Sequence, residues 1–120
     1  MSISVEHTWQ EISLKASLQP LRDSFLFFVT DQEQFGIGSI VAGVPPVNQT
    51  LLPNPSAIAL LGEKNLNLSR IIIRNLSKKL QKPVVGFIDI KADLPSAKLG
   101  KFIIELLDLL YEELENSNGV

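Results

Sequence analysis

The fold is decided by Ser24-Phe-Leu-Phe-Phe-Val-Thr30. Its five central residues are all apolar and three of them are Phe, so an extended strand here would be apolar on both faces. Such a strand is typical of the middle of a sheet, where both faces are covered. We therefore predict a central strand at this point, with further strands on either side.

Other segments of the chain carry patterns of extended structure. Residues 12–19 alternate strictly between apolar and polar, which indicates a strand with one buried and one solvated face. Downstream, Gly36–Gly43 reads as the hairpin partner of the central strand, Ser56–Leu61 as a fourth strand and Pro83–Ile90 as a fifth. A weaker, additional strand is predicted at Ile3–Trp9.

Two segments follow the helical period instead. Leu68, Ile72, Leu76 and Leu80 stand four apart, and this helix must end before Pro83. Ser96 is a predicted N-cap for a final helix. The core-facing residues of that helix are predicted to be Leu99, Ile103, Leu106, Leu107, Leu110 and Leu114, with Phe102, Ile104 and Leu109 off that row.

Together these patterns predict an α+β protein. The expected order is β-β-β-β-α-β-α, giving a mostly antiparallel sheet of about five to six strands with two helices packed on it. The chain of 120 residues is expected to form a single domain, 1–120, because two domains would each lack enough residues for a full core.

The composition argues against an enzyme. There is no Cys, which excludes a thiol nucleophile, a disulfide and a cysteine-bound metal or cluster, and there is a single His. His7 reads as an exposed side chain beside a carboxylate, and Asp89 as a strand-end carboxylate facing solvent or Lys91. Gly36, Gly38 and Gly43 lack the spacing and the following helix of a nucleotide-binding loop. We expect no catalytic residue, no metal and no cofactor; a small hydrolase is the enzyme alternative.

Charge is segregated along the chain, although the formal net charge is only −2. Residues 64–101 carry nine Lys or Arg and two acidic residues, whereas residues 102–120 carry five acidic residues and no Lys or Arg. Two interpretations stay open: the helices attract each other across their polar edges, or each charged ridge meets a complementary protein. For the second, the basic candidates are Arg70, Arg74, Lys78 and Lys79. We expect no nucleic acid, because the basic helix has no interleaved aromatic residue for stacking.

The central strand also carries more apolar surface than two helices can cover. Phe25, Phe27 and Val29 point to one face and Leu26 and Phe28 to the other, and the two helices can lie on only one of these faces. We predict that the second face is buried against a partner, in an obligate or long-lived dimer. Either set is a candidate for that contact.

In order and spacing, the chain resembles the proteasome assembly chaperone 4 family from about Val5 to Glu115. The resemblance is carried by Asp23–Val29, by Leu60-Leu-Gly62 before a basic helix, by Leu76–Lys82, by Val84–Ile88 and by the acidic final helix. Membership of the related chaperone 3 family is the other option.

The resemblance implies a heterodimer with a proteasome assembly chaperone 3 counterpart. This pair would bind alpha subunits of the 20S proteasome and promote formation of the alpha ring, and it implies no catalytic motif. A dimeric scaffold domain of roadblock or longin type, in a trafficking or GTPase-regulating complex, is the alternative. No membrane-spanning or signal segment is expected, so we expect a protein of the cytoplasm, or of cytoplasm and nucleus.

Overall fold

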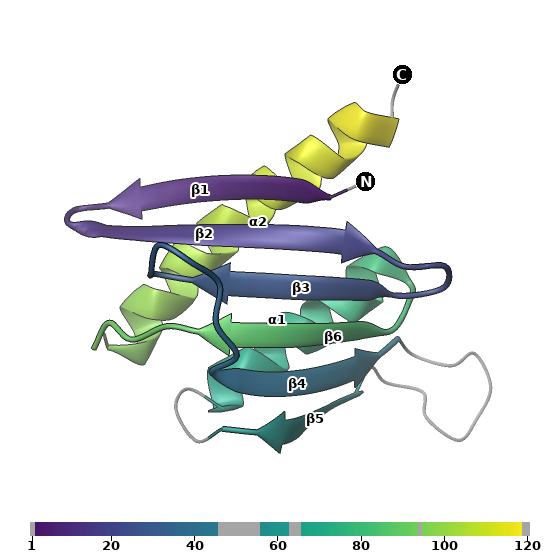
Figure 1. Ribbon diagram of the computed structural model, residues 1–120, viewed down its shortest axis with the longest axis horizontal. Coiled ribbons are helices and arrows are strands. Elements are labelled where there is room, and N and C mark those ends of the chain that lie inside the picture. The colour runs from purple at the N-terminus through teal and green to yellow at the C-terminus, as the bar shows by residue number, and fades with distance from the viewer. Residues whose placement is uncertain (1, 46–55, 63–65, 94, 119–120) are drawn as a thin grey trace.

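The computed structural model describes residues 2–45, 56–62, 66–93 and 95–118. A six-stranded sheet lies in front of two helices (Figure 1). The elements in chain order are β1 (Ile3–Trp9), β2 (Ile12–Pro20), β3 (Phe25–Thr30), β4 (Ser39–Val44), β5 (Ser56–Leu61), α1 (Leu66–Leu80), β6 (Val84–Asp89) and α2 (Ser96–Asn118).

The strands lie side by side in the order β1-β2-β3-β6-β4-β5. Every neighbouring pair is antiparallel except β3 and β6, which run parallel. The α+β class and the mostly antiparallel sheet with two helices are therefore confirmed. The prediction that β3 is a central strand is also confirmed, since β2 and β6 flank it.

Both helices cover the same face of the sheet (Figure 1). α1 packs on β4, β5 and β6, while α2 packs on β1 and β2. The predicted helical rows are confirmed: Ile72, Ile73 and Leu76 of α1 are buried, and α2 contributes the largest share of the core. The buried residues of α2 are Leu99, Phe102, Ile103, Leu106, Leu107 and Leu110.

Two glycines lie in the sheet where α1 packs most closely against it. Ile73, which has no exposed surface, lies over Gly43 of β4 and Gly86 of β6. A Cβ added to Gly43 would stand 2.8 Å from Ile73 Cγ2, and one added to Gly86 would clash with Ile73 Cδ1. Glycine at these positions lets the helix approach the strands closely enough to bury Ile73 completely.

Asp31 ties together the ends of the two parallel strands. Its carboxylate accepts hydrogen bonds from the backbone N–H groups of Lys91, at 3.0 Å, and Ala92, at 2.7 Å, just beyond β6. Burial alone would raise the pKa of Asp31, but the hydrogen bonds from Lys91, Gln32 and Ala92 hold it below its ordinary value. Asp31 thus fixes the chain where it leaves β6.

Four details differ from the sequence-based expectations. The segment predicted as the hairpin partner of β3 does not pair with it, because β6 lies between β3 and β4 and pairs with both. The segment Ile3–Trp9 is a full edge strand, paired with β2 at all seven positions. β4 starts at Ser39 rather than Gly36, because Gly38 has a φ of 51° and passes close over the backbone of Ile88. Phe102, expected off the core row of the last helix, is 2% exposed because β1 covers it.

Candidate functional site

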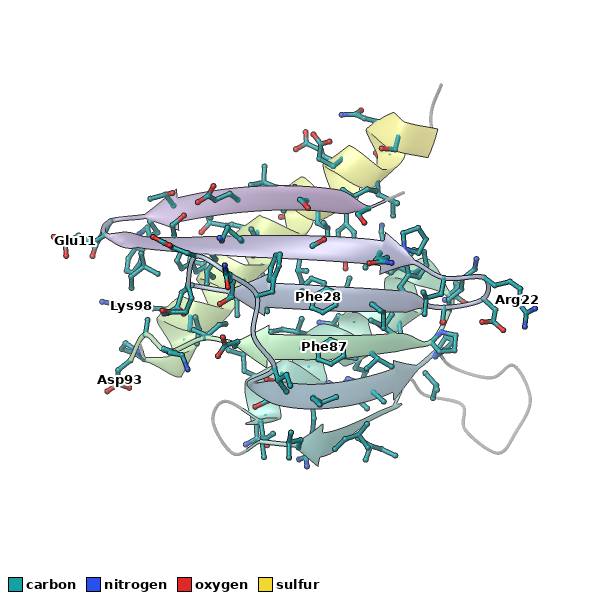
Figure 2. All side chains as sticks on the ribbon, in the orientation of Figure 1. Glu11, Arg22, Phe28, Phe87, Asp93 and Lys98 are labelled. Carbon is teal, nitrogen blue, oxygen red and sulfur yellow. The ribbon has the colours of Figure 1, made fainter. Side chains whose placement is uncertain are left out.

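An apolar patch occupies half of the sheet face that carries no helix. It comprises alternate residues of four adjacent strands, which the register places next to one another: Leu26, Phe28, Val85, Phe87, Ile40, Ala42, Ile58 and Leu60. Phe28 and Phe87 stand directly opposite each other and their rings stack, with centroids 4.9 Å apart and planes at 11° (Figure 2). Ile58 and Leu60 are 65% and 62% exposed. The apolar patch is therefore a contiguous set of hydrophobic side chains on a face that no helix covers.

Phe35, in the connection between β3 and β4, lies at the rim of the apolar patch. Its ring is 5.7 Å from that of Phe28, and the side chain is 42% exposed. Ile37, two residues further along, is 59% exposed. The connection between β3 and β4 therefore adds apolar surface at the edge of the patch, and its own apolar side chains stay exposed.

The other half of the same face is polar. On β1 and β2, hydroxyl groups are linked across the strands: Thr8 Oγ1 donates to Ser13 Oγ at 3.2 Å, and Ser13 Oγ donates to Glu6 Oε2 at 2.6 Å. Lys15 donates to the backbone carbonyl of Glu33. The apolar patch thus ends at the boundary between β2 and β3.

The structure separates the two sets of candidates on β3. Phe27 and Val29 are 0% and 1% exposed beneath the helices, and Phe25 packs against the same core with Lys82 Nζ 5.7 Å from its ring. Leu26 and Phe28 are half-buried on the face without helices. Of the five candidates, only these two lie on the face of the sheet that the helices leave uncovered.

The basic candidates form one exposed ridge on α1. Arg70, Arg74, Lys78 and Lys79 are all exposed. Within the described parts of the chain, none of them lies within 4.0 Å of a carboxylate. Lys79 Nζ instead sits 5.5 Å from the ring of Tyr111 on α2. Among the described residues, no ion pair therefore joins these four side chains to α2.

Tyr111 of α2 lies beside Lys79, near the end of α1. Burial, with the nearby charge of Asp108, raises the pKa of its hydroxyl to about 12. A neutral Tyr111 therefore persists through the whole physiological range and offers its ring to Lys79.

His7 and Asp89 are not brought together. His7 lies on β1, where Nε2 is 3.7 Å from Glu105 Oε2 and the ring meets Phe102 edge-on at 5.2 Å. Asp89 ends β6, which is separated from β1 by β2 and β3, and its Oδ1 is 3.5 Å from Lys91 Nζ as the sequence suggested. In the described residues, no group of three or more His, Cys, Asp or Glu is placed to hold a metal ion.

Comparison with known proteins gives one informative result. No protein-family model and no curated protein matches the chain. Among solved structures, one described as the crystal structure of a novel chaperone complex for yeast 20S proteasome assembly matches with a TM-score of 0.68 and 18% identity. The match covers 95% of this chain and 97% of that one. The fold resembles that of a proteasome assembly chaperone.

The extent of this match means that nearly the whole chain shares the fold. At 18% identity it carries no residue-level role from that protein to this chain. The described helices include none long and apolar enough to cross a membrane.

Proposed function

We propose that this protein is a non-catalytic chaperone for assembly of the 20S proteasome. In this role it forms a heterodimer with a chaperone 3-type counterpart, and the pair binds alpha subunits and promotes alpha-ring formation in the cytoplasm or nucleus. The fold likeness over nearly the full length of both chains is the observation that carries the proposal. The apolar patch and the unneutralised ridge on α1 support it.

The apolar patch suits the long-lived contact with the counterpart. Its centre is the Phe28–Phe87 stack, and stacked aromatic residues in a ring of aliphatic ones are typical of the energetic centre of an interface. Placing a charge on that stack would leave it buried and unpaired in the dimer, which costs several kcal/mol.

The ridge on α1 suits the second contact, with an alpha subunit. Charged groups that are exposed and unpaired in the free protein set the orientation and rate of an encounter more than its final strength. A row of exposed Arg and Lys side chains on one helix is therefore suited to an alpha subunit that must be bound and later released.

The test is purification of the tagged protein from its own cells, with identification of what accompanies it. Wild-type protein should bring down the counterpart and alpha subunits. The pair Phe28→Glu and Phe87→Glu should lose the counterpart, whereas Ser4→Glu, on the polar half of the same face, should retain it. Arg70→Glu with Arg74→Glu should lose alpha subunits and keep the counterpart, and Arg22→Glu, in the exposed β2–β3 turn, is its control.

Two outcomes would contradict the proposal. Small GTPases or their regulators in place of proteasome subunits would point to a scaffold of roadblock or longin type. Cellular proteasome levels that stay normal when the protein is absent would remove the assembly role altogether.

A further inference from the structure

Among the described residues, no strand pairs with the outer edge of β1. β1 pairs with β2 at seven consecutive positions and ends the sheet, so half of its backbone N–H and C=O groups point away from any strand. Natural sheets usually protect such an edge with a proline, a lysine or a bulge. The segment Ile3–Trp9 has no Pro or Lys, and its register with β2 is regular.

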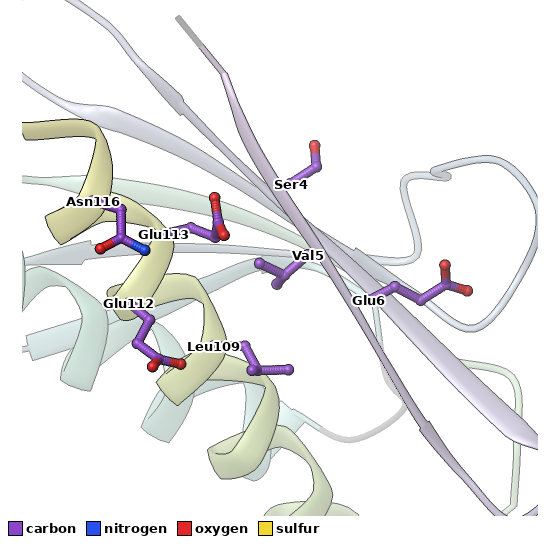
Figure 3. Close-up of a pocket in the computed structure, with 7 residues that line it drawn as sticks. All are labelled: Ser4, Val5, Glu6, Leu109, Glu112, Glu113 and Asn116. Atoms are coloured by element: carbon purple, nitrogen blue, oxygen red, sulfur yellow. The ribbon is translucent and has the colours of Figure 1, made fainter.

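An acidic groove lies along the first half of this edge, between β1 and α2. It has a volume of about 370 Å³ and is lined by Ser4, Val5, Glu6, Leu109, Glu112, Glu113 and Asn116. Val5 points toward α2 across from Leu109, whereas Ser4 and Glu6 turn to the opposite face (Figure 3). Glu112 and Glu113 are exposed and have no cationic partner within the described chain.

An aromatic hollow lies along the second half of the edge. It has a volume of about 330 Å³ and is lined by Trp9, Lys98, Lys101, Phe102 and Glu105. The rings of Trp9 and Phe102 are 6.0 Å apart and tilted at 60°, and Phe102 is buried while Trp9 is half-buried. The floor is apolar and the charges stand at the rim.

The two hollows have a spacing that an extended chain can match. Val5 and Trp9 lie on the same side of β1 and are four residues apart, about 13 Å along a strand. α2 runs beneath β1 in the reverse direction, so Leu109 serves the first hollow and Phe102 the second. A strand added beside β1 would point alternate side chains toward α2, and two of them, four residues apart, would lie over the two hollows.

We propose that the edge of β1 binds an extended, basic segment of a partner protein by strand addition. The segment places a Lys or Arg over Glu112 and Glu113 and, four residues away, an aliphatic or aromatic side chain in the aromatic hollow. Backbone hydrogen bonds to β1 supply affinity, and the two hollows supply selectivity. The open edge and the hollows beneath it carry the proposal; the carboxylates determine the charge of the occupant.

This surface is separate from the apolar patch, because β1 and the patch lie on opposite sides of β2. The proposal therefore does not depend on the function proposed above. Binding at the edge leaves the patch open, so that the protein can hold its counterpart and the extended segment together.

The probes for the test are two short synthetic peptides of alternating Thr and Val. One carries a lysine followed four residues later by a leucine, and the other carries the same two residues in reverse order, so that both strand directions are covered. Trp9 is the only Trp in the chain, so its fluorescence reports directly on the aromatic hollow. One of the peptides should shift that emission, and amide NMR signals of Ile3–Trp9 should move while those of β4 stay in place.

Charge exchange provides the specificity test. Glu112→Lys with Glu113→Lys should weaken binding of the lysine peptide about tenfold, and should strengthen binding of the same peptide with glutamate in place of lysine. Asp23→Lys with Glu33→Lys, the same change in charge at two exposed positions outside both hollows, should alter neither. No emission change with either peptide, equal loss of both charge forms, or NMR shifts centred on the apolar patch would each overturn the proposal.

Discussion

The close packing of α1 on the sheet predicts that the substitution Gly86→Ala destabilises the protein. The new methyl group would overlap Ile73 Cδ1 and stand 2.8 Å from Ile73 Cγ1. Since Ile73 is fully buried, it cannot turn away into solvent. Either its side chain leaves its preferred rotamer or α1 moves off the sheet.

The magnitude follows from this geometry. Overpacking by one methyl group in a dense core costs about 1–3 kcal/mol of the free energy of unfolding. Ile73→Ala alone should cost about 2–5 kcal/mol, by loss of burial and by the cavity it leaves. In the double variant, Ile73→Ala removes both Ile73 atoms that the methyl group introduced by Gly86→Ala would overlap, and leaves only Ile88 Cδ1 at an ordinary contact distance of 3.4 Å. The double variant should therefore be no less stable than Ile73→Ala alone, with a coupling of about 1–3 kcal/mol.

Urea unfolding of the four proteins, at equal protein concentration, measures this coupling. Gly100→Ala is the matched control, because among the described residues a methyl group there would meet only Leu68 Cδ1, at 3.8 Å. Gly100 lies within α2, so its replacement should stabilise the protein by about 0.5–1 kcal/mol. Additive effects of Gly86→Ala and Ile73→Ala would refute the explanation that steric overlap between these two residues fixes the position of α1.

Two further predictions concern titrating groups. Asp31→Asn should lower the free energy of unfolding by about 1–2 kcal/mol at pH 7, because a neutral amide accepts the Lys91 and Ala92 N–H groups more weakly than a carboxylate does. The pKa of Asp31 is lower in the folded than in the unfolded protein, so its contribution to stability is present above the unfolded pKa and is lost as pH falls through the folded pKa. Urea titrations of both proteins should therefore show a smaller difference in the free energy of unfolding near pH 3 than at pH 7. An equal difference at the two pH values would contradict this. Tyr111, the only Tyr in the chain, should titrate near pH 12 in an ultraviolet absorbance titration, and Asp108→Asn should lower that midpoint. Because folding raises this pKa, stability should fall as pH rises above about 10, and a midpoint of 10 in the folded protein would show that Tyr111 is not shielded.

Local patterns predicted the elements well, because each depends on its own residues. The alternation over residues 12–19 and the four-residue spacing from Leu68 to Leu80 both follow from which side chains a strand or helix can bury. The start of β4 was misplaced because the φ of Gly38 depends on the neighbouring strand β6, which passes beneath it. The burial of Phe102 was not predicted, because it depends on contacts with His7 and Trp9 of β1, a strand that the sequence indicates only weakly.

The candidate site was predictable only in part. The alternation on β3 indicates that Leu26 and Phe28 share a face, but not whether helices cover that face or the other. The remaining members of the apolar patch, such as Phe87 and Ile58, depend on the insertion of β6 between β3 and β4 and on its register. Pairings between residues this far apart in sequence leave no local signal. Trp9 and Leu109 meet the same difficulty, because their hollows exist only where α2 crosses β1.

The position of β6 has a consequence for how the protein is made. β6 is the last strand to leave the ribosome, yet it joins the β1–β2–β3 meander to the β4–β5 pair. Until residues 84–89 are available, β3 and β4 each present an unpaired edge, and the aromatic residues of β3 have a neighbouring strand on the β2 side only. The nascent chain therefore exposes the apolar, aromatic residues of β3 from the time β3 emerges from the ribosome until β6 emerges. A chain truncated before Val84 should aggregate rather than form a smaller sheet. The exposed edge of β3 is covered only when β6 has been synthesised and has paired with it.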